Sequence, residues 1–206
     1  MASGVVDQLK TLDSNLLLGI VRQDQNDPGF SILDWSVATL SKKGVMNAEG
    51  LWRFSGHGLD ATGSTRPWTV VLKRIENISI PEDIHSIWYE TRDALFYESG
   101  LMEHLQGSIK PPRCYGIWRQ ADSVWIWMEF IPEFIDEWSL DDYATVAHAF
   151  GQLHSAYLTG TPLPVSPGCA SATRSTGWKL EIASWIGVMP VYRCLSARSF
   201  AEGMSN

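Results

Sequence analysis

Apolar residues alternate with polar ones along several short stretches of the chain. Residues 51–58, LWRFSGHG, show this alternation, and residues 67–76, PWTVVLKRIE, are rich in aromatic and β-branched side chains. Both features are typical of β-strands. Short polar loops join the first strands to one another and the last two to each other, which favours antiparallel pairing. By these criteria the chain contains five strands, at 32–44, 51–58, 68–73, 113–118 and 124–128.

A period close to 3.6 residues replaces this alternation elsewhere. Apolar residues recur three and four positions apart over residues 82–106, which predicts one long amphipathic helix beginning after Pro81 and ending at Gly107. A weaker pattern at 4–18 predicts an N-terminal helix, followed by a polar loop at 23–29. Strands, a helix, two further strands and a final helix together indicate an α+β fold.

The last predicted helix covers residues 139–158. Ser139 is suited to cap this helix, and Asp141 and Asp142 in its first turn complement the helix dipole. The apolar stripe that we expect to face the core comprises Leu140, Tyr143, Val146, Ala147, Phe150, Leu153, His154 and Tyr157.

The periodic pattern ends near residue 164. Residues 167–206 hold four basic and two acidic residues, whereas the preceding part of the chain holds twelve basic and twenty-one acidic ones. A segment with reversed charge balance and no period is either a poorly ordered tail or sequence from another reading frame. We interpret residues 165–206 as a divergent tail, which a frameshift or a premature stop near residue 165 would explain.

Composition restricts the class of protein. The chain has 206 residues, of which 45% are hydrophobic and 19% charged, as in globular proteins. A net charge of −7 argues against nucleic-acid and anionic-membrane partners. The N-terminus lacks a signal-peptide pattern, and no apolar run is long enough to span a membrane. The three cysteines form no pair or zinc motif, which favours reduced thiols in a cytoplasmic protein.

Few catalytic or metal-binding motifs fit the chain. Residues 56–61, GHGLDA, match G-x-G-x-x-A, but the following residues cannot open the helix whose N-terminus would receive a pyrophosphate. The five histidines show no metal-ligand spacing. We therefore predict neither a dinucleotide loop of the Rossmann type nor a metal-binding residue.

Lys73 ends the most apolar predicted strand, 68–73. One interpretation is structural: the apolar stem covers the strand end while the ammonium reaches solvent. The other is functional: a carboxylate on a packed helix holds the lysine extended toward nucleotide phosphates. Glu90, in WYETRDALFYESG, is the candidate partner on the long helix, whereas Glu98 is its competitor and Asp93 lies on another face.

Five stretches, in their order and spacing, resemble the aminoglycoside phosphotransferase-type kinases, which have a protein-kinase-like fold. These stretches are RPWTVVLKRI, WYETRDALFYESGLMEHL, IKPPRCYGIW, SVWIWMEFIPE and HAFGQLHSAYLTG. The resemblance covers residues 33–164 and implies an N-terminal kinase lobe, built from an antiparallel sheet and a long helix, and the start of a helical C-terminal lobe. It divides the chain into an N-terminal helix and loop (1–30), the N-terminal lobe (31–131), a connector with the first C-lobe helix (132–164) and the tail (165–206).

The resemblance also implies roles for individual residues. Lys73 would hold the α- and β-phosphates of ATP, and Glu90 would pair with Lys73. Glu129 and Ile131 would present backbone groups to the adenine as a hinge. The turn at 44–50, GVMNAEG, would cover the phosphates although it lacks the G-x-G-x-x-G pattern. The implied cofactor is ATP with Mg²⁺, and the implied partners are a nucleotide and a small-molecule acceptor.

The chain departs from this family where catalysis needs an aspartate. Phosphoryl transfer requires an Asp to orient the acceptor hydroxyl, and acidic or amide ligands for Mg²⁺. No histidine follows His154 and no aspartate follows Asp142, so the H-x-D-x-x-x-x-N stretch and the Mg²⁺ ligands are absent. We therefore expect an ATP-dependent phosphotransferase of the aminoglycoside or small-molecule kinase type that is truncated and inactive alone. The alternatives are a non-catalytic nucleotide-binding remnant and a protein-interaction module that uses the unfinished face of the 139–158 helix.

Overall fold

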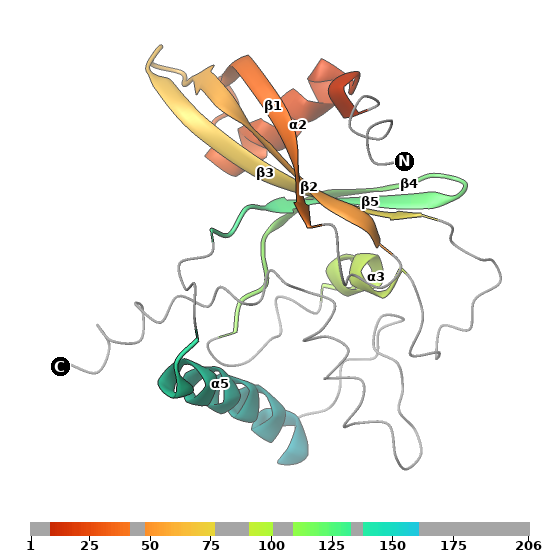
Figure 1. The fold of residues 1–206 in the computed structure, drawn as a ribbon, viewed down its shortest axis with the longest axis vertical. Coiled ribbons are helices and arrows are strands. Elements are labelled where there is room, and N and C mark those ends of the chain that lie inside the picture. The colour runs from red at the N-terminus through yellow and green to blue at the C-terminus, as the bar shows by residue number, and fades with distance from the viewer. Residues whose placement is uncertain (1–8, 42–47, 77–90, 101–108, 133–137, 161–206) are drawn as a thin grey trace. The chain divides into compact units, whose positions relative to one another are not determined.

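Two compact units divide the chain. The first contains residues 1–81 and 112–130, and the second contains residues 82–111 and 131–206. The five strands and helix α2 belong to the first unit, and helices α3 and α5 belong to the second (Figure 1). The computed structural model describes residues 9–41, 48–76, 91–100, 109–132 and 138–160.

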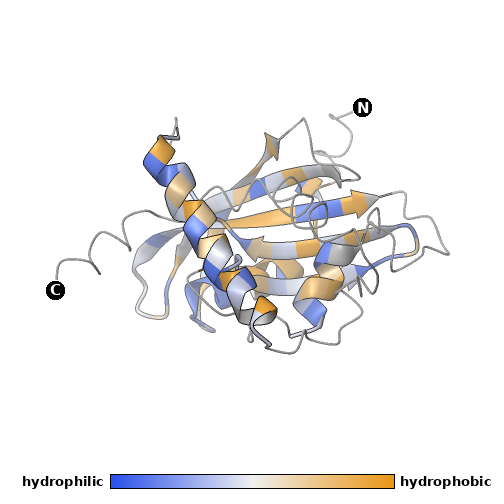
Figure 2. Cartoon of the chain, turned by 90° about the horizontal axis from the view of Figure 1, so that it is seen from below, coloured by the Kyte–Doolittle hydropathy of each residue, from blue (hydrophilic) through white to orange (hydrophobic). Residues whose placement is uncertain are grey.

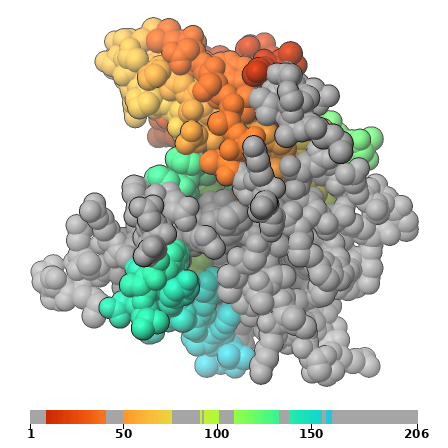
Figure 3. Space-filling model, viewed as in Figure 1, coloured from red at the N-terminus to blue at the C-terminus, as the bar shows by residue number. Residues whose placement is uncertain are grey.

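The five strands form one antiparallel sheet in the order β1-β2-β3-β5-β4. In the space-filling view, β1, β2 and β3 form one continuous surface (Figure 3). All five predicted strands, their antiparallel pairing and the α+β class are confirmed. The middle place of β3 in this order puts the strand that carries Lys73 inside the sheet and not at its edge. The strands are β1 (Ser31–Ser41), β2 (Ala48–Leu59), β3 (Thr65–Glu76), β4 (Cys114–Arg119) and β5 (Ser123–Glu129).

Helix α2 (Ser14–Gln25) packs on one face of this sheet (Figure 1). Asp13 caps its start, since its carboxylate accepts a hydrogen bond from the backbone N–H of Asn15 at 2.9 Å. Asn26 ends the helix in the left-handed conformation, with a φ of 50°. These caps explain why the helix begins and ends where it does.

The bounds predicted for the N-terminal helix, 4–18, are therefore wrong. Residues 11–13 are not helical, and α2 continues through residues 23–25, which we expected to lie in a loop. The polar Gln-Asp-Gln end resembles a loop in sequence, but Leu17, Ile20 and Val21 supply a buried face that keeps the segment helical.

Aromatic side chains fill the space between α2 and the sheet. Trp52, Phe54, Trp68 and Trp127 are all buried in this core. The ring centroids of Phe54 and Trp127 lie 5.0 Å apart, and those of Trp118 and Trp127 lie 6.3 Å apart in an edge-on arrangement. Aromatic pairs favour such tilted geometries. The tryptophans of the sheet thus serve packing on the α2 side.

The GHGLDA segment lies in a β-hairpin. β2 runs through it to Leu59, and a turn then leads into β3, which confirms that no helix follows. The Asp60 carboxylate closes this turn by accepting hydrogen bonds from the Thr62 hydroxyl at 2.6 Å and from the backbone N–H of Thr62 and Ser64 at 2.9 Å. The Thr62 hydroxyl and these N–H groups hold the pKa of Asp60 below its usual value.

Helix α3 spans only Arg92–Glu98. Gly100 has a left-handed φ of 68°, a conformation that ends helices. The single helix predicted over 82–106 is thus wrong at residue 91 and at residues 99–100, which are in turns. The rest of that prediction lies mostly outside the described residues, at 77–90 and 101–108.

Helix α5 (Leu140–Leu158) confirms the last predicted helix and its cap. The backbone N–H of Asp142 donates to the Ser139 hydroxyl at 3.2 Å, and the Asp142 carboxylate accepts from the backbone N–H of Ser139 at 2.9 Å. This reciprocal arrangement is a capping box. Hydrogen bonds from the hydroxyl and backbone N–H of Ser139 hold the pKa of Asp142 below its usual value.

The apolar stripe predicted for α5 is confirmed only in part, and Figure 2 shows polar and apolar residues mixed along the helix. Among the α5 side chains that the structure describes, the buried one is Ala149, which we did not place in the stripe. No helix in the described part of the chain combines the length and the apolarity that a membrane crossing requires. Of the predicted stripe, Leu140, Tyr143 and Ala147 are exposed, Val146, Phe150, Leu153 and His154 are half-buried, and the side chain of Tyr157 lies outside the described ones.

Candidate functional site

Lys73 lies in the middle of the sheet, on the face opposite to α2. β3 pairs it with Leu51 of β2 on one side and with Ile126 of β5 on the other. Ile126 pairs in turn with Ile117 of β4. Directly opposite residues point to the same face, so these four residues form a row across four strands. Leu72 belongs to the core beneath α2, so Lys73 points away from that core.

Apolar side chains surround this row. Val71 and Ile75 precede and follow Lys73 on the same face, and Met128 lies beside them on β5; all three are buried. Lys73 itself is only 4% exposed. It therefore does not extend its ammonium to solvent, and the interpretation of a strand-end lysine whose ammonium reaches water is wrong. Lysine is rarely buried to this extent.

The carboxylate predicted to pair with Lys73, that of Glu90, lies outside the described residues. Its competitor Glu98 is exposed at the last residue of α3, and Asp93 is half-buried in the first turn of that helix. Both residues belong to the second unit, whereas Lys73 belongs to the first. The pairing of Lys73 with Glu90 stays a prediction.

The turn predicted to cover the phosphates, at 44–50, is shorter than expected. Ala48–Gly50 belong to β2, in which Ala48 pairs with Ile75. The connection between β1 and β2 is therefore confined to residues 42–47, which lie outside the described residues.

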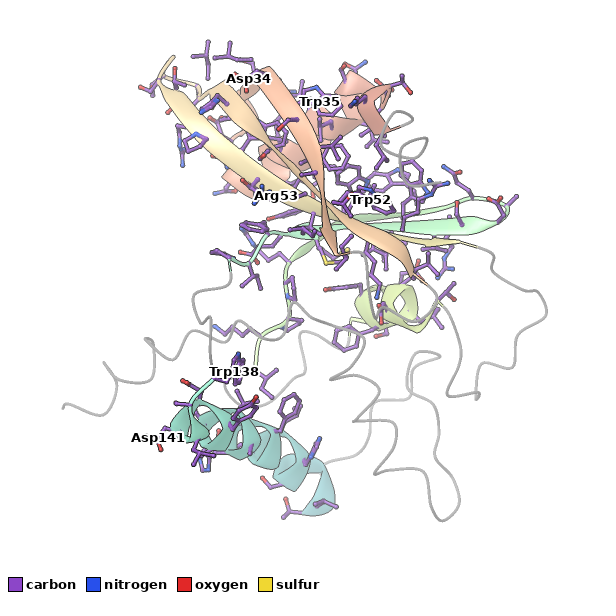
Figure 4. The ribbon with its side chains drawn as sticks, viewed as in Figure 1. Asp34, Trp35, Trp52, Arg53, Trp138 and Asp141 are labelled. Carbon is purple, nitrogen blue, oxygen red and sulfur yellow. The ribbon has the colours of Figure 1, made fainter. Side chains whose placement is uncertain are left out.

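β5 ends at Glu129, the first residue of the predicted hinge. Its backbone N–H donates to the carbonyl oxygen of Arg113 at 2.9 Å, so this N–H is not available to a ligand. Its carboxylate accepts from the backbone N–H of Arg113 at 3.1 Å and lies 3.4 Å from the guanidinium. The guanidinium carbon of Arg53 (labelled in Figure 4) lies 5.9 Å from the ring centroid of Phe130. Ile131, the second predicted hinge residue, is half-buried and belongs to the second unit.

A set of contacts that we did not predict joins α2 to the same end of the sheet. The Tyr115 hydroxyl donates to the Asp24 carboxylate at 2.7 Å, and the Arg113 guanidinium carbon lies 5.6 Å from the Tyr115 ring centroid. Burial and the hydrogen bond to Asp24 raise the pKa of Tyr115 well above its ordinary value. Burial lowers the pKa of Arg113, but the hydrogen bond to Glu129 and the nearby charges outweigh this effect and raise it.

Lys73 is a buried cation with apolar neighbours on its face of the sheet. A cation in a low-dielectric, apolar environment interacts strongly with a phosphate. Among the described residues, no group of three His, Cys, Asp or Glu side chains could hold a metal ion.

Searches of protein-family models, curated proteins and solved structures find no match to this chain. These comparisons therefore assign no family to the chain.

Proposed function

We propose that the sheet unit binds ATP, with Lys73 holding the α- and β-phosphates, and that it is the nucleotide-binding lobe of a phosphotransferase of the aminoglycoside phosphotransferase type. The observation that carries this proposal is the place of Lys73, which is 4% exposed on the middle strand of the sheet. Its apolar neighbours exclude water and strengthen the attraction between an ammonium and a phosphate.

The order of elements along the chain supports the same proposal. Protein kinases carry the phosphate-binding lysine on their third strand, at the end of a V-A-I-K motif. Here β3 is the third strand, and it reads Val70-Val71-Leu72-Lys73. Two further strands follow, and the chain leaves β5 through Glu129–Ile131, the segment proposed to contact the adenine.

The resemblance to this family implies phosphoryl transfer to a hydroxyl of a small molecule. That reaction needs an aspartate at the acceptor hydroxyl and carboxylate or amide ligands for Mg²⁺. No aspartate follows Asp142 in these 206 residues, and the described residues hold no metal-binding cluster. Among the described residues, Lys73 suits the phosphates of a nucleotide, and no cluster suits Mg²⁺. We therefore expect this chain to bind ATP without transferring its γ-phosphoryl group.

The test is to replace Lys73 by methionine, which keeps the apolar stem and removes the charge. Loss of a charge-assisted hydrogen bond to a phosphate should weaken ATP binding about tenfold to hundredfold. Isothermal titration of the folded protein with ATP in the presence of Mg²⁺ measures this difference, and thermal unfolding verifies that the variant is folded.

Lys110→Met provides the matched control, because Lys110 is exposed. This variant should bind ATP as the unmodified protein does. The proposal is contradicted if the unmodified chain does not bind ATP, or if Lys73→Met binds it as tightly as the unmodified chain.

Exposed apolar residues on α5 favour the second candidate, a protein-interaction module. Leu140, Tyr143 and Leu158 are 87%, 60% and 78% exposed. Such residues in one helix favour association when they form a contiguous patch. Sedimentation velocity at increasing concentration separates the candidates, since a monodisperse monomer at high concentration argues against the interaction module.

A further inference from the structure

Contacts between side chains run from α2 to the end of β5. The Asp24 carboxylate accepts the Tyr115 hydroxyl hydrogen bond at 2.7 Å, and the Arg113 guanidinium carbon lies 5.6 Å from the centroid of the Tyr115 ring. The main chain of Arg113 makes two hydrogen bonds with Glu129. Its carbonyl accepts the Glu129 N–H at 2.9 Å, and its own N–H donates to the Glu129 carboxylate at 3.1 Å.

Tyr115 can reach α2 because β4 is irregular at this position. Cys114 pairs with Met128 and Gly116 pairs with Trp127, so Tyr115 is an extra residue between two consecutive pairs. An extra residue of this kind redirects a side chain. Tyr115 is 8% exposed and belongs to the core beneath α2.

The segment that follows β5 is held from a second direction as well. The Arg53 guanidinium of β2 lies over the Phe130 ring, with 5.9 Å from its carbon to the ring centroid. Glu129 and Phe130 are therefore each in contact with an arginine from a different part of the first unit. A segment held from two sides has few accessible conformations, which is what precise hydrogen bonding to a planar base requires.

We propose that Asp24, Tyr115 and Arg113 are positioning residues that fix the backbone at the end of β5 for adenine, so that α2 contributes to nucleotide affinity without touching the nucleotide. This inference rests on the proposed function, because it assigns the adenine contact to Glu129–Ile131. It extends that function by making the N-terminal helix part of the binding apparatus.

The test distinguishes the contribution of the adenosine to the binding affinity from that of the phosphates. We compare the dissociation constants of ATP and of inorganic triphosphate, each with Mg²⁺, for the unmodified chain, Tyr115→Phe and Lys73→Met. Tyr115→Phe should weaken ATP binding about fivefold or more and leave triphosphate binding unchanged. Lys73→Met should weaken both ligands. A change confined to ATP cannot come from a general loss of stability, which would affect both ligands alike.

Two more variants complete the design. Tyr143→Phe removes the same hydroxyl from an exposed tyrosine on α5 and should change neither constant. Asp24→Asn keeps an acceptor for the Tyr115 hydroxyl, so it should weaken ATP binding less than Tyr115→Phe does. It also provides the measurement if Tyr115→Phe does not fold, in which case any ATP-selective weakening supports the proposal.

The outcomes distinguish the inference from the function on which it rests. If the unmodified chain binds neither ligand, the proposed function is wrong and the inference is wrong with it. Suppose instead that the unmodified chain binds both ligands. If Tyr115→Phe then leaves the ratio of the ATP and triphosphate dissociation constants unchanged, the inference alone is overturned. The same outcome in Asp24→Asn overturns it if Tyr115→Phe does not fold.

Discussion

Replacement of Trp127 by alanine is expected to lower the free energy of unfolding of the sheet unit by about 3–5 kcal/mol. Trp127 is fully buried in the core beneath α2, where its ring contacts those of Phe54 and Trp118 at centroid distances of 5.0 and 6.3 Å. Alanine would remove these contacts and leave a cavity that the surrounding strands cannot close. Urea denaturation followed by far-ultraviolet circular dichroism measures the change.

Trp127→Phe is the matched control for this prediction. The indole N–H of Trp127 has no hydrogen-bond partner among the described residues, so phenylalanine loses ring volume but no hydrogen bond. We expect it to cost about 1–2 kcal/mol, well below the alanine variant. An alanine variant within 1 kcal/mol of the unmodified chain would show that Trp127 does not belong to a close-packed core.

Replacement of Gly56 by alanine is expected to destabilise the sheet by about 1–3 kcal/mol or more. Gly56 pairs with Trp35 of β1, and a Cβ at position 56 would overlap the main-chain carbonyl of Asp34. Figure 4 labels Trp35 and Asp34. Main-chain atoms in a strand cannot move away as the end of a flexible side chain can, so β1 and β2 must separate locally. Thermal unfolding of the purified variant measures the loss.

Gly151 of α5 provides the opposite case. A Cβ there meets no atom of the described residues within 4 Å, and alanine favours helices over glycine. Gly151→Ala should therefore raise stability by about 0.5–1 kcal/mol. If both alanine variants had the same effect, close approach of β1 would not be the reason for glycine at position 56.

The sheet was predictable from sequence because its signals are local. Alternation and β-branched residues identify all five strands, and short polar loops identify their antiparallel pairing. Ser139 as a cap, with Asp141 and Asp142 in the first turn, similarly predicts the start of α5. The apolar residues before Lys73 mark it as a candidate site residue. Its burial depends on which residues of β2 and β5 lie beside it, and these residues cannot be predicted from the apolar segment alone.

The remaining features depend on contacts between distant residues or on backbone conformation. Asp24 and Tyr115 are 91 residues apart, and the polar stretch around Asp24 has the composition of a loop. The irregularity in β4 that directs Tyr115 to α2 has no signature in CYGIWR. Gly100 could have suggested the end of α3, but the apolar period on both sides of it favoured one continuous helix.

Covalent labelling tests nucleotide binding at Lys73 most directly. In an acyl-phosphate derivative of ATP, a lysine amine beside the phosphates attacks the acyl carbon and the nucleotide departs, so the acyl group marks that lysine. We expect tandem mass spectrometry to find the label at Lys73 and expect excess ATP to suppress it. Labelling of exposed Lys10 and Lys110 without labelling of Lys73, or labelling of Lys73 that ATP does not reduce, would contradict the proposal that Lys73 holds nucleotide phosphates.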